Sequence, residues 1–219
     1  MLKKAPRPLG TKALPRPRGR PTVMPDEAQR NRIVADARKL LLEKGYGRTT
    51  TDEIASRCRI SKQTLYRHFP GKHALFAAIV DSHRQSMLAL PGDYGGLPLQ
   101  QTLEKIFKID IDAQADQERA ALLRLVMMES QQYPELENML RRHGADRSRA
   151  ELANWLAEQA RRGRIAIDDA DSTAHILMDM IFGAVVLKHN QQFTWPSAKK
   201  RQAHIRRCVS IFLAGVVPR

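Results

Sequence analysis

Polar and charged side chains that suit contacts with DNA bases are concentrated between residues 61 and 72. The exposed face of a short helix in this stretch would carry Lys62, Gln63, Thr64, Arg67 and His68. Gln63 can form a bidentate hydrogen-bonded pair with adenine, and Lys62 or Arg67 can reach the major-groove edge of guanine. These residue types at helical spacing therefore predict a helix that reads base edges in the major groove.

A second set of residues is placed for phosphate groups. Thr50 and Lys72 each begin a predicted helix, where free backbone N–H groups and the helix dipole favour an anion. Tyr66 and His68 are also candidates for phosphate contacts, although Tyr66 has an alternative as a core residue with only its hydroxyl at the rim. The expected DNA-binding set in this region is Arg48, Thr50, Arg59, Lys62, Gln63, Thr64, Tyr66, Arg67, His68 and Lys72.

Two short helices must position these side chains. Thr50 and Glu53 form a capping-box pattern, which predicts a helix start. Residues 59–61 interrupt that helix, and Ser61 can cap a second helix over residues 62–68. Two short helices joined by a short turn in a basic region indicate a helix-turn-helix. Its expected packing brings Ile54, Ala55 and Cys58 against Ile60 and Leu65.

Almost every segment after residue 25 repeats its apolar residues with the helical period, and none shows sustained alternation. The predicted fold is therefore all-α, with about nine helices. Apart from the two short helices, the predicted helices cover about residues 26–44, 72–90, 99–110, 122–129, 134–163, 168–190 and 197–217. We expect a flexible arm over 1–25, a helix-turn-helix domain over 26–75, and an effector-binding and dimerisation domain over 76–219.

Positive charge is concentrated near the N-terminus. Of the formal net charge of +14, residues 1–25 contribute +7, residues 26–80 contribute +5 and residues 81–219 contribute +2. A polyanionic partner at this end is the simplest interpretation. The proline-rich arm contains residues 17–21, Pro-Arg-Gly-Arg-Pro, which resemble an AT-hook core. Arg18 and Arg20 are thus expected in the minor groove, with a basic solvated leader as the alternative.

Several classes of protein are excluded. The longest apolar run, Met180 to Leu187, has about eight residues against the roughly 18 needed to span a bilayer. Only two cysteines are present, which argues against a disulfide-stapled secreted domain. No apolar stretch follows the basic first residues, so we expect a cytoplasmic location. Metalloprotease, paired-cysteine, P-loop and dinucleotide-binding motifs are all lacking, so we expect no enzyme activity, no metal and no cofactor.

The region around the two short helices resembles the DNA-binding signature of the TetR family of bacterial transcription regulators. The resemblance covers about residues 26–75 and rests on Gly45-Tyr46, Thr49 to Ala55, Ile60 to Lys72 and Leu75-Phe76. It implies a homodimeric repressor whose C-terminal helices bind a small inducer and whose last two helices dimerise. It also implies that Tyr66, His68 and Lys72 hold phosphates. A much weaker resemblance to efflux-type subfamilies rests on the helix start at Pro134, on Trp155, and on Arg162 to Ile165.

Two positions depart from the family pattern. Arg59 occupies the turn position where the family usually has glycine, and a left-handed conformation there costs a non-glycine residue roughly 1–2 kcal/mol. Gln63 occupies a position that is usually small in the family. It either adds a base contact or changes the tilt of the reading helix, so the operator cannot be inferred from relatives.

The helix predicted over 168–190 is apolar over much of its circumference, and the last helix carries a matching apolar stripe. A helix that is apolar all round is buried on all sides. We therefore expect a four-helix dimer interface, with both helices as the core of a monomer being the alternative. The expected interface residues are Met180, Gly183, Leu187, Ile205, Val209 and Phe212. Such a dimer would hold its reading helices about 34–36 Å apart, on an inverted-repeat operator.

The nearly neutral C-terminal part is expected to enclose a pocket for a small effector of unknown identity. The candidate lining residues are Phe107, Asp110, Val126, Glu129, Trp155, Met178 and Asp179, each with ordinary core packing as the alternative. The three acids need partners if they are buried. Those partners are either a cationic ligand or, internally, Arg124 or His175. A different function also stays open: a ligand-independent, nucleoid-architectural or partner-recruiting DNA-binding protein.

Overall fold

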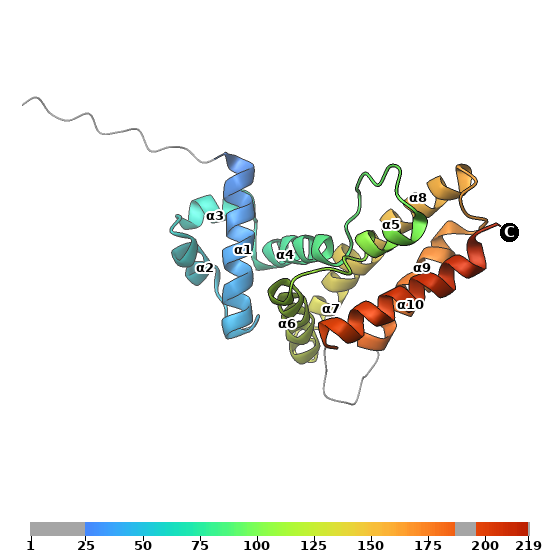
Figure 1. The fold of residues 1–219 in the computed structure, drawn as a ribbon. Helices are drawn as coiled ribbons and strands as arrows, with labels where there is room; N and C mark the ends of the chain where they lie inside the picture. The colour runs from blue at the N-terminus through green and yellow to red at the C-terminus, as the bar shows by residue number, and fades with distance from the viewer. Residues whose placement is uncertain (1–24, 187–195, 219) are drawn as a thin grey trace, which may run out of the picture.

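The structure is a computed structural model that describes residues 25–186 and 196–218 (Figure 1). All regular elements within these two ranges are helices, which confirms the all-α prediction. The basic arm with Arg18 and Arg20, and the expected interface residue Leu187, lie outside the described residues. None of the described helices is both long enough and apolar enough to cross a bilayer.

The order of elements agrees closely with the sequence prediction. The helices are α1 (Asp26–Lys44), α2 (Thr51–Cys58), α3 (Lys62–His68), α4 (Lys72–Met87), α5 (Leu99–Ile106), α6 (Ala113–Glu129), α7 (Glu135–Met139), the π-helix η1 (Leu140–Ala145), α8 (Asp146–Arg161), α9 (Ala170–Val186) and α10 (Ala198–Val216). The three elements α7, η1 and α8 follow one another without a break, so the single helix predicted over 134–163 contains a π-helical turn.

Local hydrogen bonds fix the helix-turn-helix as the sequence predicted. Thr50 and Glu53 form a complete capping box at the start of α2, and Ser61 Oγ accepts a hydrogen bond from the Thr64 N–H at the start of α3. Arg59 ends α2 in the left-handed region, with φ 54° and ψ 45°. The predicted non-glycine left-handed turn is therefore confirmed. At the other end of the domain, α1 begins at Asp26, and the preceding N-cap residue Pro25 makes no side-chain capping hydrogen bond.

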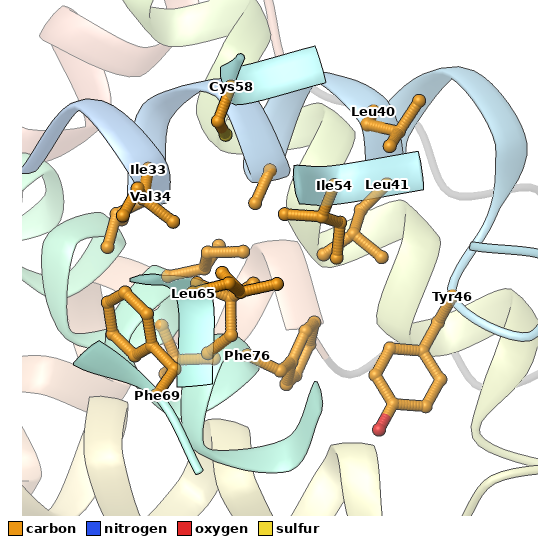
Figure 2. Packing of buried hydrophobic residues seen from close by; sticks show 14 of the residues in the cluster. Ile33, Val34, Leu40, Leu41, Tyr46, Ile54, Cys58, Leu65, Phe69 and Phe76 are labelled. Atoms are coloured by element: carbon orange, nitrogen blue, oxygen red, sulfur yellow. The ribbon is translucent and has the colours of Figure 1, made fainter. Parts of the chain in front are cut away.

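The first hydrophobic core joins the helix-turn-helix to α4 and α6. Ile33 and Leu41 from α1, Ile54 from α2 and Leu65 from α3 are all nearly inaccessible to solvent and converge on Phe76 of α4 (Figure 2). The core continues into α6 and α7 through Leu122, Val126 and Leu136. Because α1 contacts both α4 and α6, the domain that carries the reading helices shares one core with the C-terminal part of the chain.

The second hydrophobic core lies at the opposite end of the molecule, among α5, α8, α9 and α10 (Figure 1). Ile205, Val209 and Phe212 of α10 belong to it and are 2%, 0% and 7% exposed. The predicted dimer interface is not tested by a single chain, but these three side chains are already covered by the helices of their own chain. Met180 and Gly183 of α9 are only half-buried.

Candidate nucleic-acid interface and ligand cavity

The α3 surface presents the predicted base-reading side chains to solvent. Lys62, Gln63 and Arg67 are exposed, and Thr64 is half-buried because it pairs with the Ser61 cap at the helix start. Tyr66 is 46% exposed, and its hydroxyl lies 3.2 Å from Thr51 Oγ1. The alternative interpretation of Tyr66 as a core residue is therefore wrong, and its phenol group is available on the surface.

Acidic side chains hold the cations of α3 in place. Lys62 Nζ lies 2.7 Å from an Asp52 carboxylate oxygen, and this pairing raises the pKa of the lysine. Arg67 reaches Asp26 at 3.3 Å. All four side chains are exposed, and ion pairs between exposed groups contribute little to stability. Both cations can therefore exchange their carboxylate partners for DNA phosphates or bases.

Two of the predicted phosphate contacts face inward in this conformation. The His68 ring, with a side chain only 3% exposed, lies 3.0 Å from Gln29 Oε1 on α1. Lys72 donates a hydrogen bond to the carbonyl oxygen of Tyr46, and its ammonium lies 4.1 Å from the centre of the Tyr46 ring. Burial lowers the pKa of this lysine. Arg48 and Arg59 remain exposed, whereas Thr50 caps α2.

Glu129, predicted to line the effector pocket, instead connects α6 to the turn that precedes α2. Its two carboxylate oxygens accept hydrogen bonds from the backbone N–H groups of Tyr46 at 3.0 Å and Gly47 at 2.9 Å. Gly45 has a φ of 89°, and a Cβ there would lie 2.2 Å from Glu129 Oε1. The turn over residues 45–47 therefore forms a small cradle for this carboxylate, and the pocket assignment of Glu129 is wrong.

Most of the other predicted pocket residues also lie elsewhere. Asp110 is exposed because α5 ends at Ile106, before the predicted stripe reaches it. Asp179 is exposed and lies 3.5 Å from His175, which is one of the internal partners that the sequence suggested. Phe107 and Val126 are fully buried core residues in separate clusters. Trp155 lines shallow hollows beside the loop over residues 91–96.

A different cavity, of about 260 Å³, lies between α4, α6, the α7–η1–α8 run and α9. Met178, which the sequence predicted for the pocket, is among its lining residues. Apolar side chains dominate the wall: Met87, Leu88, Leu123, Leu140, Met178 and Phe182. The π-helical turn η1 supplies part of this wall, and such turns occur frequently at functional sites.

His83 is a polar group within this apolar wall, and the sequence analysis missed it. The residue is 4% exposed, and neither ring nitrogen has a hydrogen-bond partner among the described residues. Burial, with smaller contributions from the charges of Arg119 and Arg38, lowers the pKa of His83 to about 4. The imidazole is therefore neutral near pH 7. Its position on the apolar stripe of α4, after Ile79 and Val80, is the sequence signal that could have identified it.

Apolar side chains on the outer faces of the last two helices are left uncovered by the chain itself. Ile176 on α9 is 57% exposed and Ile211 on α10 is 59% exposed. α9 and α10 contact each other, and large apolar side chains exposed on neighbouring helices are candidates for contact with another protein surface. These residues, rather than the buried stripe of α10, are the ones available to a second chain.

Two family models match the chain. The model described as bacterial regulatory proteins of the tetR family matches residues 33–79, and that of the AefR-like transcriptional repressor C-terminal domain matches residues 101–215. The first match spans the helix-turn-helix. The second spans α6 to α9 and α10 except its last residue. It therefore includes the cavity-lining residues of α6 to α9 and the exposed residues Ile176 and Ile211.

Individual proteins with a similar sequence or structure agree with these matches. An uncharacterized HTH-type transcriptional regulator of Mycobacterium tuberculosis is 27% identical over 158 residues, which cover 71% of this chain and 73% of the relative. The regulator UidR of Escherichia coli is 27% identical over 173 residues, covering 74% and 83%. A TetR-family regulator structure from Mesorhizobium loti superposes with a TM-score of 0.65 at 24% identity, covering 90% of this chain and 100% of the other. The flavonoid-responsive regulator FrrA has a TM-score of 0.59 at 25% identity, covering 88% and 99%.

Proposed function

Because the chain belongs to the TetR family of bacterial regulatory proteins, we propose that it is a cytoplasmic repressor that a small molecule releases from its operator. In this proposal the chain binds an inverted-repeat operator as a homodimer, without catalytic activity of its own. The effector occupies the cavity lined by His83. The FrrA structure, named as that of a flavonoid-responsive regulator, supports a response to a small molecule in a protein of this architecture.

One observation carries the release mechanism: two of the helices that line the cavity, α4 and α6, also hold the turn before α2. On α4, His83 and Met87 line the cavity, whereas Lys72 at the other end binds the Tyr46 carbonyl. On α6, Leu123 lines the cavity, whereas Glu129 binds the N–H groups of the same turn. A ligand that displaces either helix therefore displaces the turn from which the reading helices start.

The proposed DNA contacts follow from the exposed face of α3. Lys62, Gln63 and Arg67 would reach base edges, and the Tyr66 hydroxyl and the start of α2 would reach phosphates. His68 and Lys72 would have to turn away from their present partners to contact the backbone. Arg18 and Arg20, which lie outside the described residues, would enter the minor groove as the sequence predicts.

The proposed dimer uses the uncovered faces of α9 and α10. Ile176 and Ile211 are exposed there, and a second chain would remove both from water. These helices lie at the end of the molecule opposite to α2 and α3 (Figure 1). Two chains joined in this way would each present one reading head, with the heads about 34–36 Å apart on one face of DNA.

The experiment begins with the selection of genomic DNA fragments by the full chain, followed by footprinting. The proposal predicts discrete protected inverted repeats, affinity that falls steeply with salt at a slope of about −0.9 per neutralised phosphate, and lower expression from a promoter that contains the repeat. A flat salt dependence would contradict the proposed operator binding.

A second candidate is an architectural DNA-binding protein without an effector. The charge of +7 within the first 25 residues favours it. That candidate predicts uniform coating of A·T-rich DNA rather than discrete footprints. Deletion of residues 1–24 separates the two, because a repressor keeps its operator footprint through α3 and an architectural protein loses most of its binding.

A further inference from the structure

We propose that the cavity recognises a hydroxylated aromatic molecule, whose hydroxyl group forms a hydrogen bond with the ring of His83. This inference rests on the effector role proposed above and specifies the chemistry of the ligand. It assigns to His83 a binding role that neither the sequence motifs nor the family matches indicate.

The unpaired ring of His83 itself favours a ligand that forms a hydrogen bond. Both ring nitrogens are buried and lack a protein hydrogen-bond partner within the described residues, although the residue is only 4% exposed. A buried polar group without a hydrogen bond is costly and uncommon in folded proteins. His83 lines the cavity with both nitrogens covered in this conformation, so a turn of the ring toward the cavity would let a ligand atom supply the missing partner.

The composition of the cavity wall favours an aromatic ligand. The other charged residues around the cavity are already engaged or face solvent: Arg84 pairs with Asp81 and Glu151, and Arg141 pairs with Asp146. Glu137 is exposed. The remaining wall consists mainly of leucine, methionine and phenylalanine, which suits an aromatic ring, and methionine sulfur and Phe182 contact such rings favourably.

The charges around His83 disfavour a cationic ligand. The imidazole is neutral, since burial and the charges of Arg119 and Arg38 lower its pKa to about 4. The same two guanidinium groups make the surroundings of the ring unfavourable for an ammonium ligand. A cationic effector, which the sequence had suggested as a partner for buried acids, is therefore disfavoured, because Asp110, Glu129 and Asp179 do not line this cavity.

A hydroxyl group suits the hydrogen-bonding capacity of the neutral His83 ring. A neutral imidazole offers one N–H donor and one nitrogen acceptor. A hydroxyl group both donates and accepts, so it can pair with either nitrogen, whereas a carbonyl or ether oxygen can pair only with the N–H. The cavity of about 260 Å³ is slightly smaller than the usual range for drug-sized ligands. The geometry thus favours a small aromatic molecule with one hydroxyl group.

The test uses two probes of similar shape, β-naphthol and β-methylnaphthalene, which differ in the hydroxyl group. Binding of each to the full chain is measured by isothermal titration calorimetry, for wild type, for His83→Phe and for Met178→Leu as the matched cavity control. Thermal unfolding verifies that both variants fold. The nitrogen chemical shifts of the His83 ring, assigned by comparison with His83→Phe, report directly on hydrogen bonding.

The proposal expects wild type to bind β-naphthol about tenfold more tightly than β-methylnaphthalene, as loss of one buried hydrogen bond predicts. His83→Phe should remove this preference, Met178→Leu should keep it, and β-naphthol should shift the His83 ring nitrogens. Equal affinity for the two probes in wild type, an unchanged preference in His83→Phe, or no binding of either probe would each overturn the inference.

A separate measurement of operator release distinguishes this inference from the proposed function. If β-naphthol binds through His83 but leaves the operator complex intact at saturation, the ligand chemistry is supported and the effector role of the cavity fails. If β-naphthol releases wild type and His83→Phe from the operator equally well, the effector role is supported and the assignment of His83 fails.

Discussion

The contact between Glu129 and the turn over residues 45–47 gives a quantitative prediction for the variant Glu129→Gln. The carboxylate accepts two backbone hydrogen bonds, at 3.0 Å from Tyr46 and 2.9 Å from Gly47. A hydrogen bond to a charged group contributes about 1.5–3 kcal/mol, and partial exposure of Glu129 reduces this value. Glutamine keeps one acceptor oxygen and loses the charge, so we expect destabilisation of about 1–2 kcal/mol, with roughly twice that for Glu129→Ala.

The assay is urea unfolding of the full chain followed by circular dichroism. Glu137→Gln, which changes an exposed carboxylate on the neighbouring α7, is the matched control and should shift stability by less than about 0.5 kcal/mol. Gly45→Ala should also destabilise, because its φ of 89° disfavours a side chain and the added Cβ would meet Glu129. Equal stability of Glu129→Gln and Glu137→Gln would refute the argument that Glu129 secures this turn.

Three further predictions concern the turn, the reading helix and the cavity. Arg59→Gly removes a strained left-handed residue, so the free energy of unfolding, measured by thermal unfolding, should rise by up to about 1 kcal/mol while operator affinity falls. A lower free energy of unfolding would contradict the inference that Arg59 is strained. Asp52→Asn removes the carboxylate that pairs with Lys62, so operator affinity, measured by fluorescence anisotropy, should rise severalfold at low salt. The control Asp93→Asn, in a loop, should leave the affinity unchanged. Unchanged affinity of Asp52→Asn would contradict the proposal that Lys62 exchanges Asp52 for DNA. Folding lowers the pKa of His83 from its ordinary value of 6.5 to about 4, so below pH 6.5 the unfolded chain binds a proton that the folded chain does not, and wild type loses stability. The stability of His83→Phe relative to wild type should therefore increase by about 1 kcal/mol when the pH is lowered from about 7.5 to about 5.5. A stability difference that does not depend on pH would refute the lowered pKa.

The helix-turn-helix could be predicted from the sequence because its determinants are local. The capping box of Thr50 and Glu53 and the Ser61 cap are hydrogen bonds between residues three apart, so the chain carries the whole signal in a few positions. The left-handed conformation of Arg59 follows from the same short turn. In this region the helix propensities of the residues and their local hydrogen bonds favour the same two helices, and the structure contains these helices.

The pocket and the interface could not be predicted in the same way, because periodicity identifies a buried face but not what covers it. Ile205 and Val209 lie on an apolar stripe of α10, and the helices that cover it belong to the same chain. Glu129 interrupts an apolar stripe, and its partners lie more than 80 residues earlier in the chain. His83 occupies a core position on α4, and only the neighbouring cavity distinguishes it from an ordinary buried histidine.

The most direct test of the account is the affinity of Gln63→Ala for a footprinted operator and for random DNA, measured by fluorescence anisotropy at one salt concentration. Gln85→Ala, an exposed glutamine on α4, is the matched control. If the exposed face of α3 reads base edges, Gln63→Ala should lose about tenfold or more in operator affinity and keep its affinity for random DNA, whereas Gln85→Ala should match wild type in both. Wild-type affinity of Gln63→Ala for the operator would contradict the account.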